Sequence, residues 1–154
     1  MTPGELREEV AIELEALATT VNELVALQKD VADREPTVRE KTAAAAFLAQ
    51  FYNGIENLLK RLSRYHNVPL PTGETWHIDL FRRFGSPPYP PLPVLFDASL
   101  AAALAPYRRF RHVAFHSYGF ALAWSYMAEG VANVERVFSQ IKARLADYLQ
   151  TIDA

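Results

Sequence analysis

Hydrophobic residues recur along most of the chain at alternating steps of three and four, which is the spacing of one face of an α-helix. In the first such segment Glu and Arg fill many of the remaining positions, as is typical of an amphipathic helix that packs against a core. The pattern therefore predicts a long first helix whose core-facing residues are Val10, Leu14, Leu17, Val21, Leu24 and Val31.

A second long helix is predicted to begin after Pro36, which interrupts the helical pattern. Thr37 and Glu40 form the Thr-x-x-Glu pattern of a capping box, a motif found at the start of helices. We expect this helix to end near the stretch "HNVPLP" (66–71). Its core-facing residues are predicted to be Phe47, Phe51, Ile55, Leu58, Leu62 and Tyr65.

The middle of the chain predicts a short helix and an irregular connector. The stretch "ETWHIDLFRRF" (74–84) has helical spacing and is followed by Gly85. Five prolines in the seven residues of "PPYPPLP" exclude a helix interior or a central strand, so we expect a polyproline II connector. Asp97 or Ser99 is expected to cap the next helix, which Pro106 either bends or restarts.

The last segment repeats the amphipathic period, and no stretch alternates with a period of two for long enough to predict a strand. The fold class is therefore all-α, a bundle of four long helices plus a short helix, up-and-down in parts, with a Pro-rich connector. A length of 154 residues fits one domain, 1–154. The core-facing residues of the last helix are predicted to be Val134, Val137, Phe138, Ile141, Leu145, Tyr148 and Ile152.

Composition narrows the class of protein. The absence of cysteine excludes disulfides and thiolate zinc sites, and it fits the reducing cytoplasm. The opening "MTPGELREEV" is acidic, which is unlike the flank of a secretory signal. The most apolar later stretch, "VAFHSYGFALAWSYMA", is interrupted by His116 and is too short to span a bilayer. We expect a soluble, cytoplasmic protein with no membrane partner.

The stretch "YRRFRHVAFHSYGF" (107–120) concentrates three arginines and two histidines in a chain of formal net charge -2. No Asp or Glu lies between Asp97 and Glu129, so these arginines have no acidic partner nearby in sequence. Guanidinium groups bind phosphate bidentately, and imidazole exchanges a proton near neutral pH. The combination predicts RNA cleavage without a metal or another cofactor: histidine transfers a proton at the 2′-OH or the leaving oxygen, and arginine stabilises the phosphorane.

Helical spacing separates these residues into two faces. At about 100° per residue, Arg108, His112 and His116 share one face, and Arg111 shares another with Tyr118. Arg111 and His116 are then about 140° apart, so one straight helix does not bring them together. Either the helix breaks near residues 117–119, or two copies of the chain assemble the site.

Arg111, His116 and Tyr118 spell R-x4-H-x-Y, which resembles the signature of HEPN-domain ribonucleases. The wider stretch "FRHVAFHSYGFAL" resembles the HepT-like toxin branch of that superfamily. Two further stretches, "FYNGIENLLKRL" and "ETWHIDLF", resemble segments of the same branch. The resemblance covers about Phe47 to Met127, whereas the first and last helices match only in type.

The resemblance implies a specific function. HEPN toxins are metal-independent ribonucleases that act as two-fold dimers, so Arg111 and His116 would be the catalytic pair of a homodimer that cleaves cellular RNA, tRNA or mRNA. Tyr118 would be the tyrosine to which a minimal nucleotidyltransferase (MNT) antitoxin adds AMP, as in type VII-like toxin–antitoxin systems. The added anionic group would block the cleft between the protomers.

Six further residues are candidates for RNA binding or for support of the site. Arg108 and Arg109 are expected at a solvated or RNA-contacting surface, and His112 either binds RNA or packs. His77 lines the same cleft or packs beside Trp76. Tyr52 and Glu56 lie one helical turn apart and could brace Arg111, or could belong to the core and the surface, respectively.

Other interpretations remain open from the residues alone. The fold could serve as a non-catalytic HEPN nucleotide- or protein-binding module whose basic residues bind without cutting, or as a purely structural bundle. Arg111 could be a structural cation paired with Glu56, and Tyr118 could pack at the end of the bundle.

Overall fold

The computed structural model describes residues 1–116 and 123–152, and of residues 113–116 it describes the backbone alone. The described part of the chain is helical and contains no strand, which confirms the all-α fold class. Four long helices and one short helix follow in the order α1 (Pro3–Asp30), α2 (Val38–Tyr65), α3 (Trp76–Arg82), α4 (Ala98–His116) and α5 (Trp124–Thr151).

Side-chain caps fix where three of the long helices begin. Thr2 and Glu5 form a capping box at the start of α1, and Thr37 and Glu40 form the expected one at the start of α2. At the start of α4, the Asp97 carboxylate accepts a hydrogen bond from the backbone N–H of Leu100 at 2.7 Å. Of the two candidate caps for this helix, the structure therefore selects Asp97.

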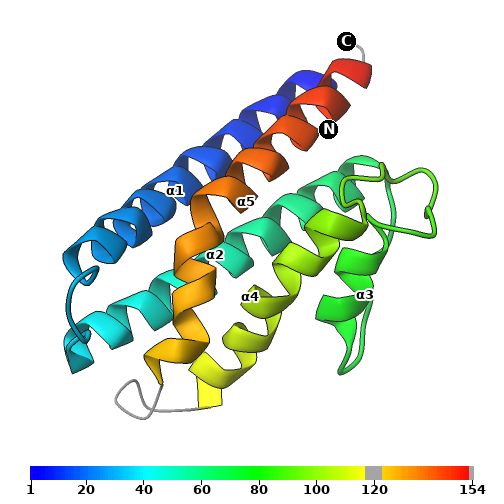
Figure 1. The fold of residues 1–154 in the computed structure, drawn as a ribbon. Coiled ribbons are helices and arrows are strands. Elements are labelled where there is room, and N and C mark those ends of the chain that lie inside the picture. Colours follow the sequence, from blue (N-terminus) through cyan, green and yellow to red (C-terminus); the bar gives the residue numbers. More distant parts are fainter. Residues whose placement is uncertain (117–122, 153–154) are drawn as a thin grey trace.

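The long helices alternate in direction, as expected for an up-and-down bundle (Figure 1). α1 is antiparallel to α2, and α4 is antiparallel to both α2 and α5 (Figure 1). α2 lies at the centre and contacts each of the other helices. The Arg7 guanidinium donates hydrogen bonds to the carbonyl oxygens of Leu149 and Ile152, which ties the start of α1 to the end of α5.

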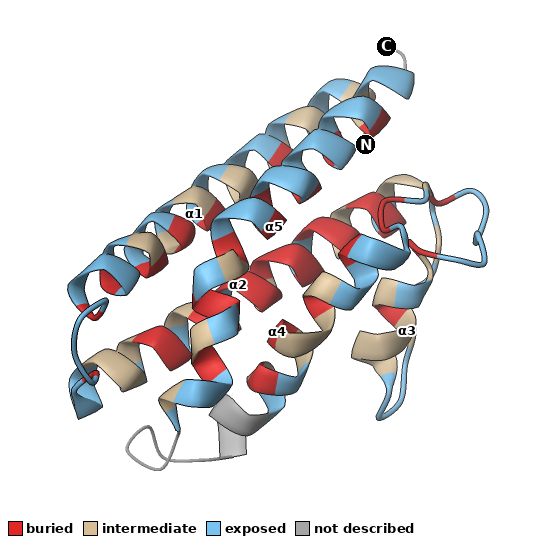
Figure 2. Cartoon of the chain, in the orientation of Figure 1, coloured by how far each residue is buried: buried red, intermediate tan, exposed pale blue. Residues whose placement is uncertain are grey.

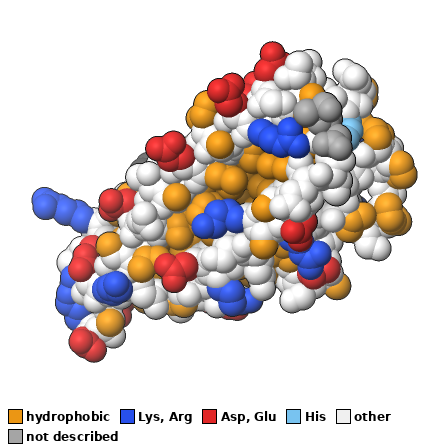
Figure 3. Space-filling view, turned by 90° about the horizontal axis from the view of Figure 1, so that it is seen from above, with side chains coloured by type: hydrophobic (Ala, Val, Ile, Leu, Met, Phe, Trp, Pro, Cys, Tyr) orange, Lys and Arg blue, Asp and Glu red, His pale blue; other side chains and the backbone are white. Residues whose placement is uncertain are grey.

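The core lies where the predicted hydrophobic faces meet (Figure 2). Most of the predicted core positions of the first, second and last helices are buried; Leu14, Phe47, Tyr65 and Ile152 are partly buried and pack against the core. A space-filling view shows hydrophobic side chains in the hollow middle of one face, surrounded by charged ones (Figure 3).

The Pro-rich connector differs from the expected polyproline II conformation. It forms a turn in which the backbone N–H of Leu92 donates to the carbonyl oxygen of Tyr89, and the Ser86–Pro87 and Pro90–Pro91 peptide bonds are cis. Polyproline II has no internal hydrogen bonds, so that expectation is wrong. Pro106 lies inside the single helix α4, which excludes a helix restart at this position.

Candidate functional site

Basic side chains of α4 and a histidine of α3 line one hollow of about 520 Å³. Arg108, Arg111 and His112 follow the i, i+3, i+4 spacing that places side chains on one side of a helix. Arg109 adjoins them. We call this space the basic hollow. It is lined by eight residues: Tyr52, Glu74, His77, Ile78, Arg108, Arg109, Arg111 and His112.

Arg111 reaches across to α2 and α3. Its Nε–H donates to the Asn53 side-chain oxygen at 3.0 Å, and the same nitrogen lies 3.4 Å from Glu56 Oε1. A second guanidinium nitrogen lies 3.1 Å from Nε2 of His77. The Arg111 side chain keeps 23% of its surface exposed, so it also faces the basic hollow.

The contact with Arg111 fixes the state of His77. A guanidinium has donors and no acceptor, so Nε2 of His77 accepts the hydrogen bond and the ring proton lies on Nδ1. Nδ1 is 3.4 Å from Glu56 Oε1. Burial, together with the positive charges of Arg111 and Lys60, lowers the pKa of His77 below its ordinary value. His77 is therefore held neutral beside a permanent cation.

Glu56 and Tyr52 are both buried in α2 beneath the basic hollow. Burial raises the pKa of Glu56, and the charges of Arg111 and Lys60 oppose that rise. Burial also raises the pKa of Tyr52, so its phenol is neutral. Among the described residues, the Tyr52 hydroxyl has no hydrogen-bond partner. Asn53 and Glu56 of α2 contact Arg111, and no hydrogen bond joins the Tyr52 hydroxyl to it.

The remaining candidates differ in how much the structure describes. Arg109 and His112 are exposed at the basic hollow, and Arg108 is half-buried there. His116 is the last residue of α4, and its side chain lies outside the described residues. Tyr118 also lies outside them.

Asn53 and Glu74 are among the contributors to this site that sequence reasoning missed. Asn53 lies three residues before Glu56, so both face the same side of α2, and this spacing was the available signal. Glu74 lines the basic hollow from the segment before α3, and no pattern in the sequence marks it. Within the described part of the chain, no group of three or more His, Asp or Glu residues is arranged to hold a metal ion.

A family model described as HepT-like protein matches residues 43–152, about 71% of the chain. The chain belongs to the HepT-like family. The match extends past the stretch from Phe47 to Met127 that carried the resemblance and includes all of α5. Neither the curated proteins nor the solved structures yield a match.

Membership of the HepT-like family confirms the resemblance to that family and agrees with the helical bundle. The matched segment contains Asn53, Glu56 and His77, whose side chains contact Arg111, whereas α1 lies outside it. No helix among the described residues has both the length and the apolar character needed to cross a membrane.

Proposed function

We propose that this HepT-like protein is a metal-independent endoribonuclease and the toxin of a HEPN/MNT toxin–antitoxin system. The observation that carries the proposal is the basic hollow, where three arginines and two histidines surround about 520 Å³ of space. Such a concentration of guanidinium groups suits the phosphates of RNA. The substrate in this proposal is a cellular RNA, a tRNA or an mRNA.

In the proposed reaction, the RNA 2′-OH attacks the adjacent phosphorus and the bond to the 5′ oxygen of the next nucleotide breaks. His116 transfers a proton at the 2′-OH or at the leaving oxygen, and Arg111 stabilises the charge on the phosphorane. The products are a 2′,3′-cyclic phosphate and a 5′-OH. Burial and the charges of Arg111 and Lys60 lower the pKa of His77, and its Nε2 already accepts the hydrogen bond from Arg111, so His77 adds no charge to the site.

The path of α4 supports a site assembled from two copies. α4 is helical through His116, so Arg111 and His116 stay about 140° apart on it, and a break after His116 would not change that angle. A second copy related by a two-fold axis would supply the missing partner. The proposal therefore includes a homodimer.

Tyr118 is the proposed point of control. It follows Arg111 by seven residues in a basic stretch, and AMP added to its hydroxyl by the antitoxin would introduce a negative charge beside the arginines. We expect the modified toxin to bind RNA weakly because the added phosphate competes for the same guanidinium groups.

A growth assay tests the toxin proposal. Induction of the wild-type chain without its antitoxin is expected to stop growth and to fragment cellular RNA, whereas Arg111→Ala and His116→Ala should do neither. Arg39→Ala is a matched control, because Arg39 is an exposed arginine of α2 away from the basic hollow. Arrest by the His116→Ala variant equal to that by the wild type would contradict the proposal.

Intact mass spectrometry tests the control of Tyr118. Co-expression with the neighbouring nucleotidyltransferase is expected to add AMP to the wild type and not to Tyr118→Phe. Tyr126→Phe is the control, because Tyr126 is the most exposed large hydrophobic residue described. Unchanged addition to the Tyr118→Phe variant would remove the proposed role.

One observation favours a second candidate function. Two guanidinium nitrogens of Arg111 contact side chains of α2 and α3, an arrangement that also suits a structural cation in a non-catalytic binding module. In that case the chain would bind RNA or another partner without cutting. An intact RNA in the presence of bound wild-type protein would favour this alternative.

A further inference from the structure

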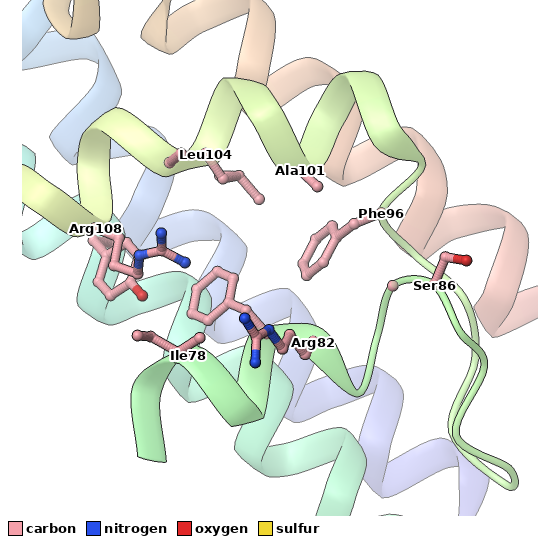
Figure 4. Close-up of a pocket in the computed structure, with 11 residues that line it drawn as sticks. Ile78, Arg82, Ser86, Phe96, Ala101, Leu104 and Arg108 are labelled. Atoms are coloured by element: carbon pink, nitrogen blue, oxygen red, sulfur yellow. The ribbon is translucent and has the colours of Figure 1, made fainter. Parts of the chain in front are cut away.

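A second, smaller pocket lies between α3, the connector and α4, and has a volume of about 140 Å³. Phe81, Phe96 and Leu104 supply hydrophobic wall, and Arg82 and Arg108 add two cations. Figure 4 shows Phe96, Leu104 and the two arginines around the same space. We call this space the aromatic pocket. An apolar cavity of about 150 Å³ holds one benzene ring, so this pocket has the size for a single six-membered ring.

Tyr52 brings a buried hydroxyl to the wall of this pocket. Tyr52 lines the pocket and is 1% exposed, yet its hydroxyl has no hydrogen-bond partner among the described residues. Its ring stacks on Phe81 with a centroid distance of 4.8 Å, which holds the phenol in place. A buried hydroxyl without a partner is costly, so an occupant that accepts a hydrogen bond here would recover that cost.

The aromatic pocket adjoins the basic hollow. Tyr52, Ile78 and Arg108 line both spaces, so a ligand can place a ring in one and phosphates in the other. Arg109 and Arg111 line the basic hollow and supply positive charge for the phosphates. The pair of spaces therefore fits a group that joins a flat ring to a phosphate.

We propose that the aromatic pocket binds one pyrimidine base of a single-stranded RNA whose adjoining phosphates lie in the basic hollow. This inference rests on the proposed function, because it assigns a base preference to the same site. Uracil and cytosine both have one six-membered ring and a carbonyl at position 2, which accepts the Tyr52 hydrogen bond. A purine has a second fused ring and needs more space than the single ring that the volume of this pocket matches. Aromatic walls with a placed donor are a common way to bind an unstacked RNA base.

Fluorescence anisotropy with labelled oligonucleotides tests the base preference. The protein is the full chain carrying His116→Ala, and the probes are eight-nucleotide strands of U, C or A in EDTA, with strand integrity checked on a gel. We expect U and C strands to bind about tenfold more tightly than the A strand. Equal affinities for all three strands would overturn the inference.

A pair of neighbouring substitutions assigns the preference to the pocket. Ala101 and Ala102 are both exposed on α4, but only Ala101 lines the aromatic pocket. Ala101→Phe should fill the pocket and abolish the preference for pyrimidines, and Ala102→Phe should keep it. A preference that survives Ala101→Phe would place the base elsewhere and overturn the inference.

Tyr52→Phe provides a second test that does not depend on filling space. Because its hydroxyl has no hydrogen-bond partner among the described residues, the thermal midpoint should not fall. Affinity for the U strand should fall about fivefold with little change for the A strand. A variant that binds the U strand as well as the parent protein does would contradict the proposed hydrogen bond.

The outcome can be separated from that of the nuclease proposal. Cleavage of RNA by the wild type without any pyrimidine preference in binding would overturn the pocket assignment and leave the nuclease standing. The opposite result is also possible. If binding prefers U and C strands and Ala101→Phe removes that preference, but the wild type never cuts RNA, the pocket assignment is supported and the nuclease proposal is overturned.

Discussion

At the scale of single residues, His77 and Arg111 are coupled by a hydrogen bond and by charge. Arg111 donates to Nε2 of His77, while Nδ1 of the same ring faces Glu56. Protonation of Nε2 would remove the acceptor and place a second cation beside the first. Burial lowers the pKa of His77, and the positive charges of Arg111 and Lys60 lower it further.

We predict that the pKa of His77, measured by ¹H–¹⁵N NMR of the imidazoles, lies below its ordinary value of 6.5. Arg111→Met should raise it, because a positive charge is removed. Because the unfolded chain takes up the proton first, His77 contributes stability that is present above pH 6.5 and is lost as the pH falls through the folded-state pKa.

His77→Gln identifies the resonance among the four histidines of the chain. The same spectra report the tautomer, which should carry its proton on Nδ1 at neutral pH. A pKa at or above 6.5, or one that Arg111→Met leaves unchanged, would contradict the coupling.

At the scale of helices, α1 and α2 cross closely where Gly54 meets Leu17. A Cβ added at Gly54 would lie 2.4 Å from Leu17 Cδ2 and 2.8 Å from its Cγ. Both residues are buried, so Leu17 has little room to move. Glycine at this position lets the two helices approach and keeps the adjacent Asn53 and Glu56 in place beneath α4.

We predict that Gly54→Ala lowers the free energy of unfolding by about 1–3 kcal/mol, although alanine favours helix more than glycine does. Gly4→Ala is the control, because the nearest atom to an added Cβ there is Thr2 Oγ1 at 3.9 Å. That control should be neutral or slightly stabilising. Urea unfolding of the two variants measures the difference, and equal effects would contradict the close crossing.

The helices could be predicted from the sequence because their causes are local. The amphipathic period, the Thr37–Glu40 box and the Asp97 cap each depend on residues within a few positions of one another. The path of the connector could not be predicted in this way, because it depends on contacts between residues far apart in sequence. The N–H groups of Leu95 and Phe96 both donate to the carbonyl oxygen of Phe84. The prolines indicated an irregular segment, but they did not indicate where the chain would turn.

The sequence predicted which residues of α4 belong to the site, but it did not predict which side chains of the other helices contact them. The basic stretch indicated the residues of α4, but their angles on one helix do not say which side chains of other helices face them. Asn53 is 58 residues from Arg111 in sequence. The aromatic pocket is assembled from α2, α3, the connector and α4, so no single stretch of sequence marks it.

At the scale of the whole molecule, the proposed site needs two copies of the chain. Arg111 and His116 lie on one continuous helix, at positions that helical spacing separates by about 140° around the axis. In a two-fold dimer, Arg111 of one protomer would act with the partner's His116. Each dimer would then contain two equivalent sites, and each site would combine Arg111 of one protomer with His116 of the other.

We predict that a mixture of two inactive variants regains activity. Arg111→Ala and His116→Ala chains, unfolded and refolded together, should form mixed dimers with one intact site each, and the sample should reach about a quarter of wild-type cleavage. Each variant refolded alone should stay inactive. A mixture no more active than the single variants would contradict the shared site.

In the proposed function, Arg111 and His116 cleave RNA through its 2′-OH without a metal ion. The most direct measurement is cleavage of a labelled RNA strand, and of its 2′-deoxy counterpart, by purified protein in EDTA. We expect the wild type to cut only the RNA and to leave 2′,3′-cyclic phosphate ends, and His116→Ala to be slower by about 100-fold or more. Loss of cleavage in EDTA that added Mg²⁺ restores, cutting of the deoxy strand, or full activity of His116→Ala would contradict the account.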